Sequence, residues 1–227
     1  MNRVGLFLIV LVQSLLFMNT RPISVQERYM DQYKDMAMSE MKRSGIPASI
    51  KMAQGIMESQ AGRSELAKNA NNHFGIKCKA NWDGDTYLYV DDDRDSLGNL
   101  THSCFSMYPS PEDSYKDHTE FLTKRSRYKS LFNLSKSDYY SWAYGLKKCG
   151  YATDPSYPIK LIQTIEKYDL YMLDKEVILA EGLEYIPVTE KLTVIEPVKP
   201  IMREVQTKKT VNKNGKLKRK KIRFNKS

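Results

Sequence analysis

Glu58 is the residue whose type and setting best suit acid–base chemistry. It directly follows the apolar pair Ile56-Met57 in a segment with helical spacing, and the small residues Ser59 and Gly62 come after it. Apolar neighbours raise the pKa of a carboxyl because they disfavour its charged form. A general acid that works near neutral pH needs such a raised pKa. A Glu on a helix is more commonly a solvated surface residue, so the assignment depends on what faces it.

The densest acidic run of the chain, Asp91-Asp92-Asp93, is the natural complement to Glu58. It comes just after a predicted strand, and Asp95 is close by. Enzymes that hydrolyse glycosides commonly use two carboxyl groups, one on each side of the glycosidic bond. The alternatives are a solvated turn or a calcium-binding loop. An EF-hand loop is disfavoured because the run has no Gly at its sixth position and no Glu at its twelfth.

Other kinds of reactive site are not indicated. The three histidines, His73, His102 and His118, are scattered, and no pair has zinc-binding spacing. We interpret each as a structural or surface residue. The sequence contains no G-x-S-x-G motif and no phosphate-binding loop. We therefore expect neither a metal nor a cofactor.

The elements that must position these carboxyls follow from hydrophobic spacing and from helix-start and helix-stop residues. Helices are expected at 25–44, from Pro47 to Gly62, at 64–68, from Ser110 through Leu122, at 137–150, and from Asp154 through Met172. Strands are expected at 87–90 and 100–105, with a turn-rich segment between them. Helices, a small β lobe and helices again predict an α+β fold with a cleft between the two parts.

The cysteines favour one disulfide. Cys78 and Cys104 flank the β region, whose composition differs from that of its neighbours, so we expect them to pair. Cys149 would then be a small buried hydrophobic residue beside a helix end. A bridge between Cys104 and Cys149 is the alternative that the sequence leaves open.

The basic character of the chain resides in its last residues. The net charge is +9, but residues 203–227 contain eleven Lys and Arg and one Glu, which gives this segment +10. The rest of the chain is therefore nearly neutral, at −1. We expect a basic tail that binds an anionic envelope surface. Nucleic-acid binding is disfavoured because the remainder of the chain has no basic stripe interleaved with aromatics.

The N-terminus predicts export. After Met1-Asn-Arg3, residues 4–18 are apolar except for Gln13 and Ser14, which is typical of a secretory signal. The run is short for a membrane-spanning helix, which needs about 20 residues. An uncleaved anchor is the competing interpretation, because no A-x-A cleavage pattern precedes Asn19-Thr20-Arg21. Either one places the remainder in the periplasm, the cell envelope or the extracellular space.

Three ordered motifs carry a family resemblance. They are Met52-Ala-Gln-Gly-Ile-Met-Glu58-Ser59-Gln-Ala-Gly62, then Asn71-Asn72-His73-Phe74-Gly75-Ile76-Lys77, then Gly150-Tyr151-Ala-Thr-Asp154-Pro155. Over roughly residues 25–174 the chain resembles the glucosaminidase domain of glycoside hydrolase family 73. The resemblance implies a lysozyme-like fold and cleavage of the β-1,4 bond after N-acetylglucosamine in peptidoglycan.

The resemblance also assigns roles. It implies that Glu58 is the catalytic acid and that Tyr151 positions the sugar beside it, with Asn71, Asn72 and Phe74 lining the cleft. Members of the family differ in whether a second carboxylate, supplied by the β lobe, acts as the base. Here only aspartates can supply it, Asp92 as first choice and then Asp91 or Asp93, and assistance by the substrate's own acetamido group is the alternative. Ser59 and Asp154 complete the expected binding residues, although Asp154 also suits a helix N-cap and Phe74 suits the core.

The sequence thus predicts an exported, monomeric peptidoglycan hydrolase, an endo-β-N-acetylglucosaminidase that acts on glycan strands. The alternatives are a muramidase or lytic transglycosylase on the same fold, or a non-catalytic wall-binding protein. The expected organisation is a signal peptide or anchor at 1–22, a catalytic domain at 25–174, a linker at 175–202 and the basic tail at 203–227.

Overall fold

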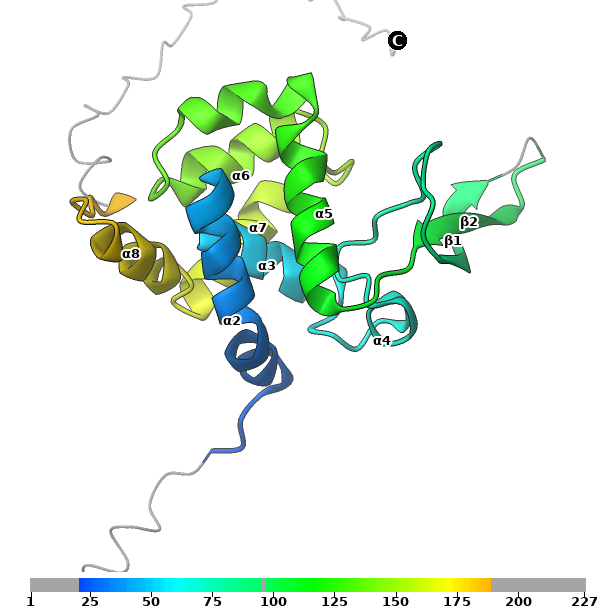
Figure 1. Ribbon diagram of the computed structural model, residues 1–227, viewed down its shortest axis with the longest axis horizontal. Helices are drawn as coiled ribbons and strands as arrows, with labels where there is room; N and C mark the ends of the chain where they lie inside the picture. Colours follow the sequence, from blue (N-terminus) through cyan, green and yellow to red (C-terminus); the bar gives the residue numbers. More distant parts are fainter. Residues whose placement is uncertain (1–20, 95–96, 189–227) are drawn as a thin grey trace, which may run out of the picture. The chain divides into compact units, whose positions relative to one another are not determined.

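The structure describes residues 21–94 and 97–188, in which helices precede and follow a two-stranded sheet along the chain (Figure 1). This computed structural model confirms the predicted α+β class, mainly helical with a small β lobe. Residues 1–20 of the expected leader and the whole basic tail lie outside the described residues. The elements are α2 (Val25–Ser44), α3 (Ala48–Glu58), α4 (Glu65–Ala70), β1 (Thr86–Arg94), β2 (Leu100–Ser106), α5 (Pro111–Thr123), the 3-10 helix η1 (Ser126–Asn133), α6 (Tyr139–Lys148), α7 (Tyr157–Lys167) and α8 (Tyr171–Ala180).

Capping residues set the ends of α2 and α5 where the sequence predicts them. Ser24 and Glu27 form a reciprocal capping box before α2, and Gly45 ends that helix in the left-handed conformation at φ 83°. The Ser110 hydroxyl accepts a hydrogen bond from the Asp113 amide, and Pro111 takes the first position of α5. None of the described helices combines the length and the apolar composition that a membrane-spanning helix needs.

Helix α3 is the centre of the helical body. It is packed against α2, α6, α7 and α8, and every residue from Ala48 to Ile56 is buried (Figure 1). Its packing is closest at Gly55, where an added Cβ would lie 2.6 Å from the Tyr29 hydroxyl. The helix ends at Glu58 rather than at Gly62, because residues 60–62 have φ values of 52°, 54° and 75°, which a right-handed helix cannot continue. Glu58 is therefore the last residue of a rigid, buried element.

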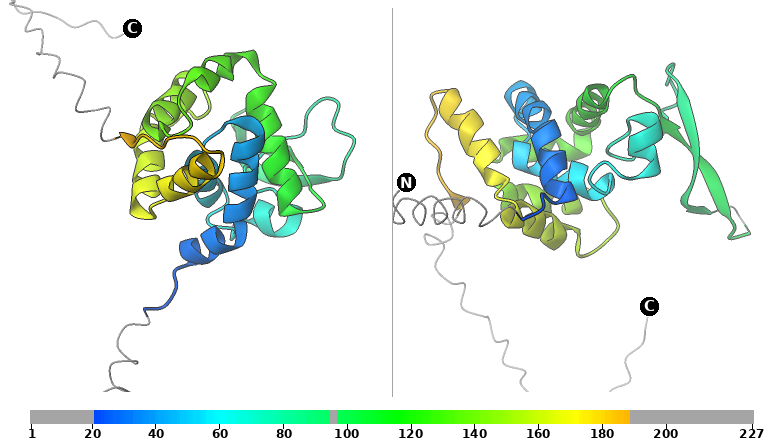
Figure 2. Two further views of the ribbon diagram at one scale, coloured as in Figure 1. Left: turned by 60° about the vertical axis from the view of Figure 1, so that its left-hand side comes forward. Right: turned by 90° about the horizontal axis from the view of Figure 1, so that it is seen from below.

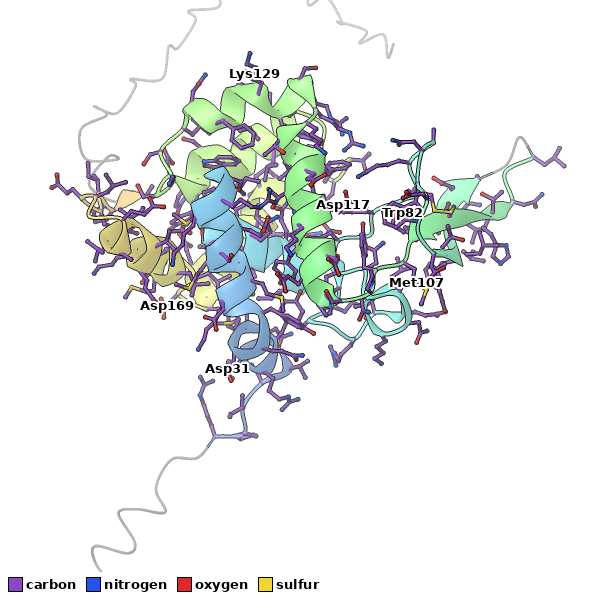
Figure 3. The ribbon with its side chains drawn as sticks, in the orientation of Figure 1. Asp31, Trp82, Met107, Asp117, Lys129 and Asp169 are labelled. Carbon is purple, nitrogen blue, oxygen red and sulfur yellow. A yellow bond between two sulfur atoms is a disulfide. The ribbon has the colours of Figure 1, made fainter. Side chains whose placement is uncertain are left out.

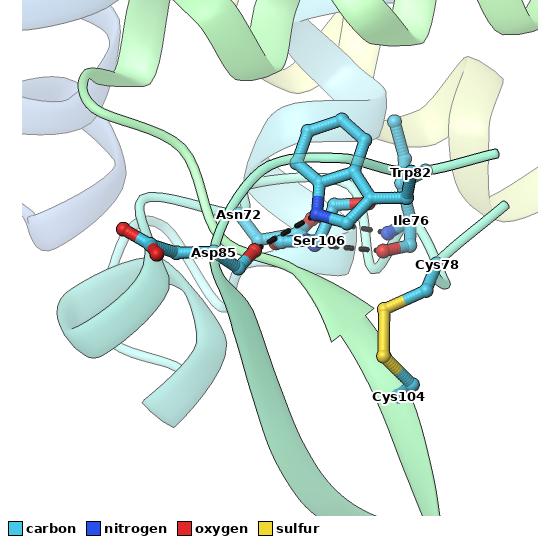
Figure 4. The surroundings of a disulfide bond; sticks show 7 residues. All are labelled: Asn72, Ile76, Cys78, Trp82, Asp85, Cys104 and Ser106. Carbon is cyan, nitrogen blue, oxygen red and sulfur yellow. Dashed lines mark hydrogen bonds between the residues drawn. A yellow bond between two sulfur atoms is a disulfide. The ribbon is translucent and has the colours of Figure 1, made fainter.

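The β lobe lies to one side of the helical body (Figures 1 and 2). Strands β1 and β2 pair antiparallel from Thr86↔Ser106 to Val90↔His102, and the register then shifts before Arg94↔Leu100. Cys78 and Cys104 form the expected disulfide, shown in Figure 4, and the Cys78 amide donates to the Cys104 carbonyl at 2.9 Å. Cys149 is a free, half-buried thiol, so the alternative bridge is wrong.

Two side chains from the helical part hold the lobe in place. The Asn72 amide nitrogen donates to the carbonyls of Ile76 and Ser106, at 2.9 and 2.8 Å, and so ties the chain entering the lobe to the chain leaving it. Asp117 lies on the side of α5 that faces the lobe, near Trp82 (Figure 3). It pairs with Lys79 and accepts a hydrogen bond from the Tyr108 hydroxyl at 2.8 Å. The lobe is thereby fixed against α5.

The C-terminal part of the described chain differs from expectation in two ways. The single helix expected from Asp154 is two helices, α7 and α8, because Asp169 adopts a left-handed φ of 52° between them. The second difference is that the expected domain end at 174 falls within helix α8. Helix α8 continues to Ala180 with Val177 and Ile178 buried, and its fully buried Asp174 accepts hydrogen bonds from the Ser49 amide at 2.8 Å and the Ser49 hydroxyl at 2.5 Å. Residues expected to start a linker thus complete the core.

Candidate active site

A cleft of about 990 Å³ runs between the helical body and the β lobe. The end of α3 contributes its floor, the loop from Phe74 to Ala80 and the two strands form one side, and α5 and the start of α7 form the other. Its walls include aromatic rings and charged groups from both parts of the fold. The lining includes Glu58, Phe74, Lys77, Asp91, His118, Tyr151, Asp154 and Tyr157.

Glu58 projects into this cleft from the C-terminal end of α3. Its side chain is exposed, but what it exposes is surface of the cleft, where the walls displace most of the bulk water. This partial removal from water raises the pKa of the Glu58 carboxyl to about 7. Within the described residues no hydrogen bond or ion pair engages the carboxyl. Glu58 can therefore hold a proton near neutral pH and present it to a ligand.

Two tyrosines stand beside Glu58. Tyr157 is buried, and its hydroxyl accepts a hydrogen bond at 2.9 Å from Gln54, one turn earlier on α3. Tyr151 lines the cleft with its ring 5.5 Å from that of Tyr157, and its hydroxyl lies 3.0 Å from Nε2 of His118. Burial is the main cause that raises the pKa of both phenols far above neutrality, followed by Tyr157 and then Glu58 for Tyr151, and by Glu58 for Tyr157. Both hydroxyls are therefore neutral hydrogen-bonding groups next to the carboxyl.

The β lobe brings one described carboxylate into the cleft, that of Asp91. Lys77 Nζ lies 2.9 Å from Asp91 and 2.5 Å from Asp93, and Ser103 donates to Asp93 at 2.7 Å. The hydrogen bonds from Lys77 and Ser103 lower the pKa of the Asp93 carboxyl. Asp93 does not line the cleft. The backbone of Asp92 belongs to β1, but its side chain lies outside the described residues, so its expected role stays a prediction.

Three residues expected to contact a ligand do not line the cleft. Ser59 is fully buried, with its hydroxyl donating to the Gly55 carbonyl at 2.5 Å and accepting from the Gly62 amide at 2.8 Å. Asn71 ends α4 in the left-handed conformation and donates to the Tyr108 carbonyl. The buried Asn72 donates hydrogen bonds to the carbonyls of Ile76 and Ser106, where the chain enters and leaves the lobe. The polar groups of these three residues instead stabilise the backbone turns around the cleft, and their expected contact with a ligand stays a prediction.

Phe74 and Asp154 do line the cleft, each with a second role. Phe74 is mostly buried and stacks on His118 with ring centroids 4.1 Å apart. Asp154 was expected to be the N-cap of the next helix, but Ser156 holds that position. Asp154 instead accepts from the Ser156 amide at 2.8 Å and pairs with Lys160 at 2.7 Å, which leaves its carboxylate at the cleft rim.

Sequence reasoning missed the polar residues behind the cleft wall. His118, interpreted as structural or surface, is buried and reaches Tyr151. Lys51 is fully buried, and its Nζ lies 3.1 Å from Nδ1 of His118. One signal was available, since Lys51 stands between Ile50 and Met52 in a mostly apolar segment. No cluster of three or more His, Cys, Asp or Glu that could hold a metal ion occurs within residues 21–94 and 97–188.

A carboxyl that holds a proton near neutral pH, at the floor of a cleft between a helical body and a small β lobe, defines a lysozyme-like glycoside hydrolase. Comparison with known proteins identifies the family. Residues 34–170 match the family described as Glucosaminidase: Mannosyl-glycoprotein endo-beta-N-acetylglucosaminidase. The chain belongs to this glucosaminidase family.

Known relatives and solved structures agree with the assignment. Exo-glucosaminidase LytG of Bacillus subtilis is 32% identical over 69% of this chain and 56% of its own length. Peptidoglycan hydrolase FlgJ of Vibrio parahaemolyticus is 29% identical over 63% of this chain and 47% of its own. The chain thus spans about half the length of these relatives. The catalytic domain of the autolysin Auto from Listeria monocytogenes superposes with a TM-score of 0.62 at 25% identity, over 71% of this chain and 93% of that domain.

Proposed function

We propose that this protein hydrolyses peptidoglycan as an endo-β-N-acetylglucosaminidase, cleaving the β-1,4 bond after N-acetylglucosamine. The observation that carries the proposal is Glu58, a carboxyl with a pKa of about 7 and no protein partner among the described residues, at the floor of an open cleft. Membership of the glucosaminidase family supports the choice of bond. The names of the relatives, a glucosaminidase and peptidoglycan hydrolases, support the choice of polymer.

In the proposed reaction Glu58 donates its proton to the glycosidic oxygen as the bond to the anomeric carbon breaks. The positive charge that develops at the sugar ring then needs a nucleophile. Asp91 is the described lobe carboxylate placed in the cleft, and it would take a proton from the attacking water. Asp92 remains the alternative in the same strand. Assistance by the acetamido oxygen of the substrate would make either aspartate less important.

The remaining cleft residues would bind the glycan. The ring of Tyr151 provides apolar surface for a sugar face, and Asp154 at the rim provides an acceptor for sugar hydroxyls. We propose that the protein acts outside the cytoplasm as a monomer, on glycan strands of the cell wall. The leader-like N-terminus and the need to reach its polymer support export.

The test is digestion of purified peptidoglycan, followed by borohydride reduction and mass spectrometry of the fragments. Wild type should give reduced N-acetylglucosamine ends, and Glu58→Gln should lose nearly all activity while keeping its circular dichroism spectrum. Glu176→Gln is the matched control, since Glu176 is an exposed residue of α8 outside the cleft. Full activity of Glu58→Gln would contradict the role of Glu58. Reduced or anhydro muramic ends would instead indicate a muramidase or lytic transglycosylase, and absence of fragments a wall-binding protein.

Fragment length distinguishes the mode of attack. An endo-acting enzyme releases long fragments early, because it cuts within strands, whereas an exo-acting enzyme releases only terminal units. Size-exclusion profiles taken at less than a tenth of complete digestion should therefore show long oligosaccharides. Release of terminal units alone would contradict the endo assignment.

A further inference from the structure

A line of buried polar groups crosses the helical body and ends at the cleft. It begins at Lys51 on α3, passes through the imidazole of His118 on α5, and reaches the hydroxyl of Tyr151. The distances are 3.1 Å from Lys51 Nζ to His118 Nδ1 and 3.0 Å from His118 Nε2 to the Tyr151 hydroxyl. Lys51 and His118 are both buried. The roles described above for the cleft do not account for either side chain.

The surroundings of Lys51 match an ammonium group. Its Nζ lies 3.0 Å from the Tyr115 carbonyl, 2.5 Å from the Thr119 hydroxyl and 3.1 Å from His118 Nδ1. A lysine ammonium has three N–H donors and no acceptor, so three donors meet three partners. Burial lowers the pKa of Lys51 to about 7, although the carboxylate of Glu40, which Arg43 holds in a bidentate ion pair, opposes this lowering, so Lys51 carries its positive charge below that pH. Nδ1 of His118 is therefore required to be an acceptor.

The accepting role of Nδ1 determines the tautomer of His118 and the direction of its hydrogen bond to Tyr151. A neutral imidazole whose Nδ1 accepts must carry its proton on Nε2. Burial and the charge of Lys51 lower the pKa of His118 well below its ordinary value, which keeps the ring neutral. Stacking on Phe74, with ring planes 10° apart, prevents the ring from turning. The Nε2–H then donates to the Tyr151 oxygen.

We propose that Lys51 and His118 are positioning residues that orient the Tyr151 hydroxyl, so that its oxygen accepts a hydrogen bond from within the protein and its proton is presented to the cleft. The acceptors available there are the Glu58 carboxyl and the oxygens of a bound sugar. If His118 were instead protonated on Nδ1, the Tyr151 hydroxyl would donate its proton to Nε2. The Tyr151 oxygen could then only accept a hydrogen bond from a ligand. The functional part of this inference rests on the proposed glycosidase activity, whereas the orientation itself does not.

The orientation is tested by nitrogen-15 NMR of the full chain labelled on histidine. Only three histidines are present, and a His118→Asn spectrum identifies the signal of that residue. The long-range proton–nitrogen pattern should show His118 with a bare Nδ1 and a protonated Nε2 from pH 5 to 6.5. In Lys51→Met this preference should weaken, while His73, whose Nδ1 contacts the Tyr29 hydroxyl at 2.9 Å, should not change. A wild-type His118 protonated on Nδ1, or on both nitrogens, would overturn the proposal.

The consequence for catalysis is tested by a matched pair of variants. The amide nitrogen of Gln reaches the position of Nε2, whereas that of Asn reaches only the position of Nδ1. His118→Gln should therefore keep kcat within about three-fold, and His118→Asn should lower kcat about 10- to 100-fold with little change in KM. In a Tyr151→Phe background His118→Asn should have no further effect on kcat. Equal losses for Gln and Asn, or additive losses in that background, would show a merely structural role.

These readouts separate failure of the inference from failure of the proposed function. If wild type cleaves no glycan, the NMR pattern still decides whether Lys51 sets the His118 tautomer. If the glycan is cleaved but His118 carries its proton on Nδ1, the glycosidase assignment stands and the orienting line is wrong.

Discussion

Glu58 combines two properties that oppose each other at most surface positions. A carboxyl that a ligand can reach is normally well solvated and ionised at neutral pH, and a carboxyl that stays protonated is normally buried out of reach. The cleft reconciles these properties because its walls limit the water around Glu58 without covering it. The same walls carry Tyr151 and Tyr157, whose hydroxyls stay protonated and can donate hydrogen bonds beside the carboxyl.

The pH dependence of the rate follows from this environment. Glu58 must be protonated to act as general acid, and it loses that proton as the pH rises through about 7. We expect kcat on soluble peptidoglycan fragments to be highest below pH 7 and to fall about ten-fold per pH unit well above it. Glu176→Gln should keep this profile. A rate that stays constant up to pH 9 would contradict the role of Glu58 as the proton donor.

At the residue scale the sequence predicted which types of side chain carry the chemistry, but not which neighbours each one has. Glu58 could be placed in the cleft because helix spacing and a motif both point to it, and Tyr151 because of its motif alone. Asn72 and Ser59 could not be interpreted, because a polar residue in a motif can serve the ligand or the backbone, and only the folded turns show the second. The partnership of Lys51 with His118 joins residues 67 positions apart, a separation at which local pattern carries no information.

At the scale of elements, α3 depends on a helix that the sequence did not connect with it. Pro47 precedes α3 and offers no side-chain cap, so the start of the helix is capped from α8 by the buried Asp174. The hydrophobic pattern located α3 but not α8, and it could not reveal this contact. The element that carries Glu58 is therefore fixed at its first turn by a residue beyond the family match at 34–170.

Removing this cap should destabilise the fold. Asp174→Ala deletes two buried hydrogen bonds and leaves the Ser49 amide and hydroxyl unpaired, which we expect to lower the free energy of unfolding by about 1–3 kcal/mol. Urea denaturation followed by circular dichroism measures the loss. Asp31→Ala is the control, since Asp31 makes only a surface ion pair with Lys34, and it should change stability by less than about 0.5 kcal/mol. Equal effects of the two variants would contradict the capping role.

The β lobe depends on its disulfide in the same way. A lobe with one two-stranded sheet buries little apolar surface, and such a sheet is marginal by itself. The bridge between Cys78 and Cys104 joins positions 26 residues apart. Replacing both by Ser should lower the free energy of unfolding by about 2–4 kcal/mol, measured in urea, whereas Cys149→Ser should have little effect. A double variant as stable as wild type would show that the sheet and the Asp117 contacts suffice.

At the scale of the whole molecule, charge and catalysis occupy different parts of the chain. The net charge of +9 comes from residues 203–227, and the rest, which includes the cleft, is close to neutral. The cleft itself is lined by basic and acidic side chains together with aromatic rings, which suits the hydroxyl and ring contacts of a glycan. The basic segment suits an anionic surface, since its attraction acts over about one Debye length, near 10 Å in 0.1 M salt.

Deleting residues 203–227 separates the two activities. Turnover of small soluble glycans should be unchanged, while sedimentation with whole cell envelopes should weaken several-fold in low salt and differ little from wild type in 1 M salt, where wild-type attraction is screened as well. A chain with the same 25 residues in scrambled order is the matched control and should bind like wild type. Envelope binding that survives the deletion unaltered would require another explanation for the tail.

The close packing of α3 also limits how this protein can vary over evolutionary time. Gly55 has no room for a side chain, because an added Cβ would meet the hydroxyls of Tyr29 and Tyr115 at 2.6 and 2.9 Å, and Gly62 combines a left-handed φ with a Cβ position 3.2 Å from the Tyr29 ring. Neither glycine lines the cleft. In a library of random variants selected for activity we would thus find both glycines retained as strictly as Glu58. Residues of this motif would then be invariant for two reasons, the close packing around α3 and the chemistry of Glu58 at its end.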